Sequence, residues 1–141
     1  MFITFVLSAA SLKTTKVTGD VQGIDKGGVY SHFAVAGNLV FVSGVSGQEK
    51  DKDTIFTEQL DKTLVKLKRI LDEAGSSISE IVKLTVYLSD KSYFNDLNDI
   101  FEKYFPAKPP ARTTIVCSFV VPRIKVEIDA IAVKLPDKKA A

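Results

Sequence analysis

The sequence predicts an α+β fold in which two helices lie on one face of a mixed β-sheet. Two segments, residues 57–74 and 94–104, repeat apolar residues at helical spacing, and the other apolar segments have the runs or the alternation of β-strands. Along the chain the order is hairpin, helix, strand, helix, strand, strand. Right-handed strand–helix–strand crossovers would place both helices against such a sheet.

A β-hairpin is expected at residues 33–42. The apolar segments 33–36 and 39–42 flank Gly37 and Asn38, two residues that tolerate positive φ and suit a two-residue turn. The second segment is apolar without alternation. We therefore expect it to be a central strand that is covered on both faces.

The first helix is predicted to end near Ala74, where Gly75 can adopt the positive φ of a helix cap. Its apolar stripe consists of Leu60, Leu64, Leu67 and Leu71. Three basic residues lie away from this stripe: Lys62, Lys66 and Arg69. The second helix has the stripe Phe94, Leu97, Phe101 and Tyr104. It ends before Pro106 because proline lacks an amide donor and disfavours helical geometry in the preceding residue.

Three further strands are predicted at residues 81–88, 113–121 and 125–135. In the first of them, alternation places Val82, Leu84, Val86 and Leu88 on one face and Lys83, Thr85 and Tyr87 on the other. In the second, Cys117 is expected to share a buried face with Ile115 and Phe119 and to be unreactive. Two helices cannot cover both faces of the sheet. The apolar candidates for the uncovered face are Val116, Val120, Ile131 and Val133, and self-association would cover them.

Length and composition favour one domain. The chain has 141 residues with 45% hydrophobic content, and residues 13–136 contain no linker or repeat, so we expect a single core there. Residues 1–12 form an apolar extension that is too short to span a bilayer. An ordered arm or strand and a targeting segment both remain open for this extension. Residues 137–141 form a Lys-rich tail.

Charge and cysteine content exclude several classes of function. The net charge of +2, with 26% charged residues, gives no long-range attraction for nucleic acid or a membrane surface. The single Cys cannot form an internal disulfide, which fits a reducing compartment, and we expect a cytoplasmic protein. With one Cys and one His, a zinc site of Cys and His ligands is excluded. We expect no metal and no cofactor.

Few residues suggest chemistry by pattern alone. Arg112 begins an apolar strand directly after Pro109-Pro110-Ala111, a stiff approach that would fix its direction, although an ordinary solvated arginine fits the pattern too. Glu127 alternates with core-facing residues and could equally belong to a solvent-facing charged row. His32 is expected to be a hydrogen-bonded structural residue. Asn98 is expected to satisfy backbone groups rather than to contact a substrate.

Several short motifs, taken in order, resemble those of the reactive-intermediate deaminase family, also called Rid or YjgF. The resemblance runs from about residue 14 to residue 135 and rests on these segments: Gly28-Val29-Tyr30-Ser31, residues 37–44, Ala74-Gly75, Val82-Lys83, Asn98, Pro110-Ala111-Arg112 and residues 126–133. It implies a chorismate-mutase-like fold, a homotrimer, and clefts between subunits that bind small carboxylic acids.

The resemblance also implies roles for individual residues. Arg112 would bind the substrate carboxylate, and Glu127 would position or deprotonate water. Tyr30 would be a cleft tyrosine whose hydroxyl polarises the substrate or relays a proton. Ser43 corresponds to the serine of a Ser-Gly motif, and Thr114 stands where some members have a cysteine. Three departures from the family pattern bear on the substrate range and would line the cleft: Val29 for Pro, Phe33 for a small residue, and Val45 for Gln.

The implied reaction is hydrolysis of small imine or enamine acids, such as 2-aminoacrylate, to a 2-keto acid and ammonia. A protonated imine is already electrophilic, so an anchor for the acid, a held water and a proton acceptor suffice without a metal. Two alternatives remain open. One is a single-stranded RNA endoribonuclease or translation inhibitor, for which Lys62, Lys66 and Arg69 offer a basic helix face. The other is a non-catalytic trimer that binds a small ligand.

Overall fold

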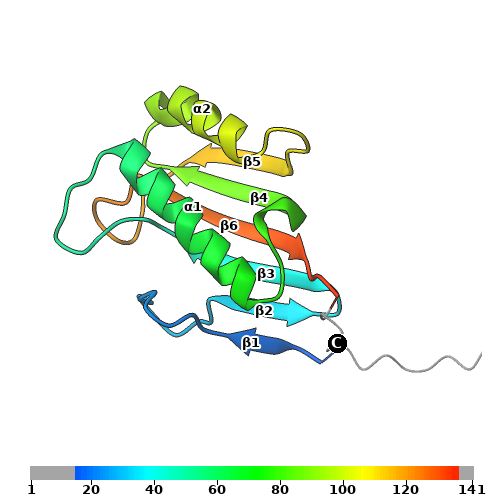
Figure 1. Cartoon of the computed structure of the whole chain (residues 1–141). Helices are drawn as coiled ribbons and strands as arrows, with labels where there is room; N and C mark the ends of the chain where they lie inside the picture. Colours follow the sequence, from blue (N-terminus) through cyan, green and yellow to red (C-terminus); the bar gives the residue numbers. More distant parts are fainter. Residues whose placement is uncertain (1–14, 137–141) are drawn as a thin grey trace, which may run out of the picture.

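Residues 15–136 form a six-stranded mixed sheet with two α-helices on one face (Figure 1). The computed structural model describes residues 15–136, so the predictions for residues 1–12 and 137–141 lie outside the described residues. The strand order across the sheet is β1-β2-β3-β6-β4-β5. The strands are β1 (Val17–Gly19), β2 (Phe33–Ala36), β3 (Leu39–Val45), β4 (Ile81–Leu88), β5 (Ala111–Val116) and β6 (Val126–Val133). The helices are α1 (Phe56–Glu73) and α2 (Phe94–Tyr104), with short 3-10 turns at Ile78–Glu80 and Lys91–Tyr93.

Strand pairing explains the mixed character of the sheet. The hairpin between β2 and β3 is confirmed, with Gly37 at φ 62° in its turn. Among the described strands, the one parallel pair is β4 with β5, which α2 connects as a crossover. Strand β6 returns from the far edge to lie antiparallel between β3 and β4. The predicted mixed sheet with two helices is thereby confirmed.

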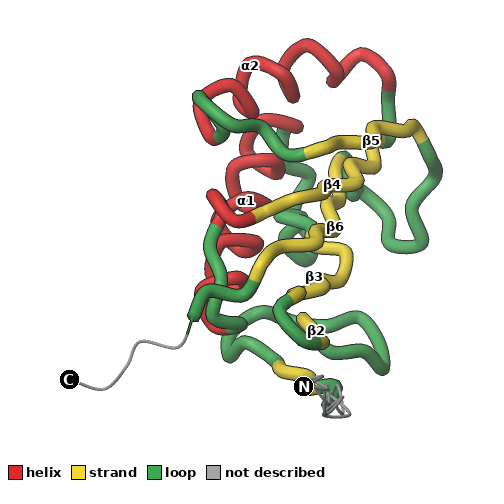
Figure 2. The backbone as a smooth tube through the Cα atoms, turned by 90° about the vertical axis from the view of Figure 1, so that its right-hand side faces the viewer, coloured by secondary structure: helices red, strands yellow, loops and turns green. Residues whose placement is uncertain are grey.

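One face of the sheet is covered, and Figure 2 shows both helices on the same side of the strands. Alternation in β6 is regular: Val126, Ile128, Ala130 and Ala132 are buried towards the helices, and the residues between them are only partly buried. Strand β3 is central as predicted, but the expectation that both its faces are covered is wrong. Val40 and Val42 are buried, whereas Phe41 between them is 41% exposed.

Helix α1 follows the prediction closely. All four leucines of its predicted stripe are fully buried, and Gly75 ends it at φ 76°. The amide of Ser76 donates to the carbonyl of Leu71 at 2.8 Å, as a helix end with a left-handed residue requires. The stripe of α2 is confirmed at Leu97 and Phe101, which are buried, while Phe94 at its start is largely exposed.

Three strand predictions need correction. In β4 the register shifts between Ile81 and Lys83, so Ile81 is buried and Val82 is 45% exposed. Strand β5 ends at Val116 rather than continuing to residue 121, and the chain then forms a loop up to β6. Cys117 lies at the start of this loop and is only partly buried, so its predicted burial is wrong. The reason is that β5 lies at the edge of the sheet formed by the described strands.

The predicted residues of the uncovered face divide into two pairs. Ile131 and Val133 do lie on it, partly buried. Val116 instead pairs with buried Leu88 on the helix side, and Val120 is fully exposed in the loop after β5. Phe41 and Ile115, which were not predicted there, also lie on the uncovered face and are largely accessible, so this face still carries exposed apolar side chains.

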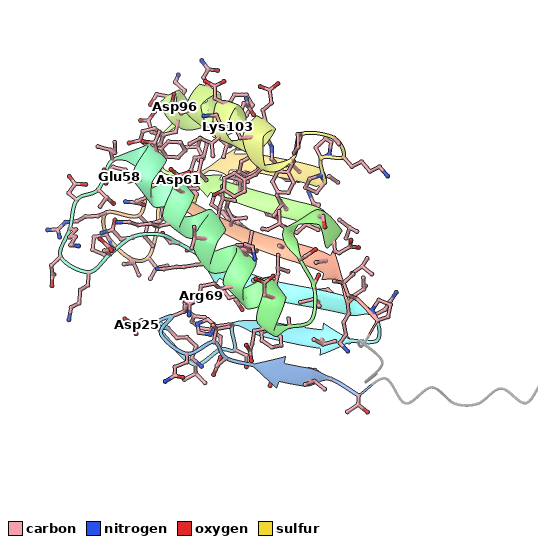
Figure 3. All side chains as sticks on the ribbon, viewed as in Figure 1. Asp25, Glu58, Asp61, Arg69, Asp96 and Lys103 are labelled. Carbon is pink, nitrogen blue, oxygen red and sulfur yellow. The ribbon has the colours of Figure 1, made fainter. Side chains whose placement is uncertain are left out.

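The first testable prediction concerns Gln59, a fully buried polar residue of α1. Its Nε2 donates to the carbonyl of Arg123 at 2.8 Å, and its Oε1 accepts from the amide of Lys125 at 2.9 Å. Gln59→Leu keeps the volume but leaves these backbone groups without a partner. It should lower the free energy of unfolding by about 2–4 kcal/mol, measured by urea unfolding. Glu58→Gln, at an exposed neighbour that Figure 3 shows pointing outwards, should change it by less than about 0.5 kcal/mol. Equal effects of the two changes would contradict this assignment.

Candidate functional site

Arg112 lies at the start of the edge strand β5, on the helix-covered side. It pairs with buried Leu84, so its side chain points under α2. A pocket of about 570 Å³ opens there, and we call it the arginine pocket; its lining residues are Leu84, Asn98, Phe101, Glu102, Phe105, Pro109, Pro110 and Arg112. Five of the eight lining residues are apolar, and the charged groups of the lining are the Arg112 guanidinium, which can hold an anion, and the Glu102 carboxylate.

The Arg112 guanidinium is fixed in direction. Its Nη2 donates to Asn98 Oδ1 at 2.8 Å, and its Cζ lies 5.3 Å from the ring centre of Phe101 and 5.8 Å from that of Phe94. These are cation–π distances. Burial lowers the pKa of Arg112, which nonetheless remains a cation at neutral pH. Arg112 is therefore not an ordinary solvated arginine.

Asn98 has a different partner from the one expected. Its side-chain oxygen accepts from Arg112 rather than from a backbone group, so it orients the guanidinium from helix α2. Its spacing beside the aromatic stripe carried no signal of this contact, because the contact depends on where β5 runs relative to α2.

Thr114 lies two residues after Arg112, on the same face of β5. Its Oγ1 is buried and has no hydrogen-bond partner among the described residues. A buried hydroxyl without a partner is costly, so the hydroxyl is available for a ligand or a neighbouring chain.

Glu127 lies on the opposite, uncovered face. It pairs with Tyr87 across β6 and β4, and its carboxylate lies over Gly44, where a Cβ would collide with Oε1 and Cδ of Glu127. Residues Ser43 and Gly44 form a bulge in β3, between the register pairs of Val42 and Val45. We call Ser43, Gly44 and Glu127 the glutamate site. The need for glycine at position 44 follows from this close approach.

Electrostatics distinguish Glu127 from an ordinary surface carboxylate. Burial raises the pKa of Glu127, and the nearby charge of Asp129 raises it further. The alternative of a freely solvated charged row is therefore not what the structure shows. A carboxyl with a raised pKa is suited to exchanging protons near neutral pH.

Ser43, a member of the glutamate site, is hydrogen-bonded to the loop that carries Tyr30. Ser43 Oγ donates to the carbonyl of Ser31 at 2.7 Å, and Ser43 is part of the lining of a second pocket of about 270 Å³ on the hairpin. Tyr30 precedes Ser31 in the loop before β2. Its ring is 43% exposed, and its hydroxyl accepts from the amide of Gly27 at 3.2 Å.

The three departures from the family pattern lie in different environments. Val29 is fully exposed in the loop before β2. Phe33 is buried, occupies the space over Gly19, and also contributes to the second pocket. Val45 is buried and pairs with Ile128 on the helix side, so the expectation that it lines a cleft is wrong.

A single chain does not bring Arg112 and Glu127 together. Arg112 pairs with Leu84 of β4, and Leu84 pairs in turn with Ala130 of β6. Ala130 lies three residues from Glu127 along β6. The two residues are thus about 10 Å apart across the strands and about 10 Å apart along them. They also point to opposite faces. The described chain therefore carries two separate groups, the arginine pocket and the glutamate site.

Other candidate chemistry is limited. His32 is buried and accepts from the amide of Val21 at Nδ1, 2.9 Å, as expected for a structural histidine. Within residues 15–136, no three His, Cys, Asp or Glu side chains gather in a way that could hold a metal ion. The helices of the same part of the chain are too short or too polar to cross a membrane.

The second prediction follows from the pKa of Glu127. Since its folded-state pKa is raised, the native state binds this proton more tightly than the unfolded chain, so ionised Glu127 lowers stability at neutral pH and protonation restores it. Glu127→Gln should therefore raise the free energy of unfolding at pH 7, by an amount that solvent screening of this half-exposed carboxyl keeps modest. The gain should shrink as the pH falls through the folded-state pKa. Glu73→Gln, at an exposed site on α1, should show no such trend. Urea unfolding between pH 4 and 8 tests this, and a destabilised Glu127→Gln at pH 7 would contradict it.

Comparison with known proteins identifies the relationship. A family model described as Endoribonuclease L-PSP matches residues 22–134. Reactive Intermediate Deaminase A, a chloroplastic protein of Arabidopsis thaliana, is 35% identical over 135 residues, which are 93% of this chain and 72% of the relative. A RutC family protein of Pyrococcus abyssi is 34% identical over 111 residues, 76% of this chain and 87% of the relative.

Solved structures agree with this relationship. Yeast Mmf1 superposes with a TM-score of 0.77 at 27% identity, covering 86% of this chain and all of that chain. A YjgF family protein of Neisseria meningitidis superposes with a TM-score of 0.74 at 23% identity over 87% of this chain and 98% of the other, which shows the shared fold. The resemblance found in the motifs is confirmed: the chain belongs to the Rid/YjgF family.

Proposed function

We propose that the protein hydrolyses small 2-imino and enamine acids, such as 2-aminoacrylate, to 2-keto acids and ammonia. The observation that carries this proposal is the arginine pocket, where a fixed guanidinium faces a space with apolar walls. A carboxylate can take two hydrogen bonds from such a planar donor. The small apolar remainder of the substrate would lie against the aromatic and proline side chains.

Arg112 acts as the carboxylate anchor in this proposal. Asn98 and the ring of Phe101 hold the guanidinium, so little conformational freedom is lost when a substrate binds. The guanidinium also orients the protonated imine acid, because it attracts only the carboxylate end of the substrate. The reacting carbon is thereby held at a defined distance from the anchor.

Glu127 provides the proton chemistry. An enamine acid first gains a proton at carbon and becomes the imine. Water then adds to the imine carbon while Glu127 takes a proton from it, and the electron pair of the C=N bond moves to nitrogen. Glu127 returns the proton to that nitrogen. As the C–N bond breaks and ammonia leaves, Glu127 takes the hydroxyl proton, the carbonyl forms, and the proton then passes to solvent. Its raised pKa suits a group that both accepts and returns a proton.

The separation of the two groups in one chain leads us to propose that the complete site forms between copies. Arg112 lies on an edge strand, and Glu127, Ser43 and the Tyr30 loop lie on or beside the uncovered face. The edge of one copy against the uncovered face of the next would bring them together. We propose a closed ring of three copies, the assembly that the family resemblance implies, because a heterologous contact forms a ring when its rotation closes. Thr114 and its unpartnered hydroxyl would face the same cleft.

The name of the Arabidopsis relative, Reactive Intermediate Deaminase A, supports the same reaction class. The description of the family model instead supports the RNA-cleaving alternative. The basic residues offered for RNA binding are, however, used within the fold. Lys62 pairs with Glu49 at 3.0 Å, Lys66 donates to the carbonyl of Ser46 at 2.9 Å, and Arg69 donates to that of Gln22 at 2.9 Å. Figure 3 shows Arg69 directed towards the loop that carries Asp25. We therefore favour deamination.

The third prediction tests the two groups by activity. Arg112→Lys keeps the charge but loses the planar pair of donors, and kcat/KM for enzymatically generated 2-aminoacrylate should fall about 100-fold or more. Glu127→Gln should lower kcat by a similar factor, with a smaller change in the binding of pyruvate as a product-like acid. Arg123→Lys, at an exposed loop position, is the matched control and should be near the parent.

The readout is ammonia release in the presence of the enzyme that generates the substrate. Parent-like turnover in both Arg112→Lys and Glu127→Gln would contradict the assignment of these residues. Binding of pyruvate without any turnover by the parent protein would instead favour the non-catalytic ligand-binding trimer.

A further inference from the structure

The uncovered face of the sheet carries an unusual acidic pair. Glu127 and Asp129 are two residues apart on β6, on the same face, and both are partly buried. None of the ion pairs among the described residues involves either of them. The neighbouring Asp129 disfavours the charged form of the partly buried Glu127, and no ion pair among the described residues offsets this effect. Such an arrangement costs stability, which suggests that it serves the chemistry of the site.

Tyr87 connects the two carboxylates. It is the register partner of Glu127 across β4 and β6, yet its hydroxyl donates to Asp129 Oδ2 at 2.9 Å. The hydrogen bond to Asp129 and burial raise the pKa of Tyr87, so the hydroxyl remains a protonated donor. The Tyr87 hydroxyl thereby fixes the direction of the Asp129 carboxylate next to the residue that must exchange protons.

The groups that face this pair from neighbouring strands do not neutralise it. Strand β3 contributes the bulge of Ser43 and Gly44, which lies opposite Asp129 and brings no charge. Strand β4 contributes Lys83, whose Nζ donates to Thr113 Oγ1 of β5 at 2.5 Å. Strand β5 adds Thr113 and Ile115, which are uncharged, and strand β2 adds Ala34. Lys16 lies at the far edge beside β1, where it lines the second pocket.

We propose that Asp129, held in place by Tyr87, is a positioning residue that acts through Glu127 and keeps its carboxylate a strong proton acceptor for the hydrolytic step. This inference rests on the proposed function for its catalytic consequence. Asp129 does not contact the substrate. Its fixed negative charge stabilises the protonated form of Glu127 that exists after water has given up its proton and before nitrogen has received it. No proton, electron or group is added to the reaction by Asp129, so the balance of the step is unchanged.

The alternative is that Asp129 and Tyr87 only support the sheet. A structural role would change stability but leave the proton affinity of Glu127 and the pH dependence of the reaction alone. Direct titration of Glu127 therefore separates the two roles, and it does so without any activity measurement.

The fourth prediction is that Asp129→Asn moves the titration midpoint of Glu127 to lower pH. The reason is that the substitution removes the neighbouring negative charge while it keeps the size of the side chain. The midpoint is measured by NMR of protein labelled with ¹³C at the glutamate carboxyl, with the Glu127 signal assigned through Glu127→Gln. Asp129→Glu, which keeps the charge, should retain most of the parent midpoint. Tyr87→Phe should give a smaller shift in the same direction, because Asp129 loses its donor but not its charge.

Activity provides the second readout. In Asp129→Asn the acidic limb of the kcat/KM profile should move to lower pH together with the NMR midpoint, and kcat should fall with little change in KM. Asp96→Asn is the matched control. This exposed residue of α2, which Figure 3 shows directed away from the sheet, should alter neither readout.

The outcomes separate this inference from the proposed function. An unchanged Glu127 midpoint in folded Asp129→Asn and Tyr87→Phe proteins overturns the inference. A lowered midpoint with an unmoved acidic limb also overturns it, since Glu127 would then not be the group that limits the reaction. If the parent protein deaminates no imino acid, the proposed function fails, and the NMR titration alone decides whether Asp129 governs Glu127.

Discussion

The structure depends on one constraint: two helices cover only one face of a six-stranded sheet. The leucine stripe of α1 and the alternate residues of β4 and β6 form the core on that side. Every residue between them must then face outwards, including Tyr87, Glu127 and Asp129. The same geometry leaves β5 as an edge strand, with Arg112 directed under α2. The charged groups that could take part in a reaction are therefore distributed over two surfaces rather than collected in one cavity.

Both surfaces have been built at some cost to the stability of the chain. A guanidinium is held partly buried between aromatic rings, and a carboxylate is placed beside a second carboxylate with which no cation of residues 15–136 forms an ion pair. A glycine is required at position 44 to make room for Glu127. Local features that lower stability are typical of functional sites, where they prepare a group for its reaction. In this chain they occur at the arginine pocket and the glutamate site, while the core of α1 follows ordinary packing rules.

Much of the fold was predictable because its signals are local. Leucine spacing and Gly75 define α1 to within a residue at each end, and Gly37 marks the hairpin. The errors concern positions where a distant strand decides the outcome. Val82 is exposed because of a register shift against β6, and Cys117 is partly exposed because β5 lies at the edge. The motifs pointed to the residues of the candidate site, but no local pattern indicates that Arg112 and Glu127 lie on opposite faces, since this depends on how β6 inserts between β3 and β4.

The opposite placement of Arg112 and Glu127 makes the central claim directly testable by mixing subunits. Arg112→Lys and Glu127→Gln proteins, each with little activity, are dissociated, mixed and reassembled, and exchange of subunits is verified by mass spectrometry. If the site takes Arg112 from one copy and Glu127 from the next, some clefts in the mixed assemblies receive both native residues, and deaminase activity should reappear. Continued inactivity of assemblies shown to contain both variants would contradict a site shared between copies.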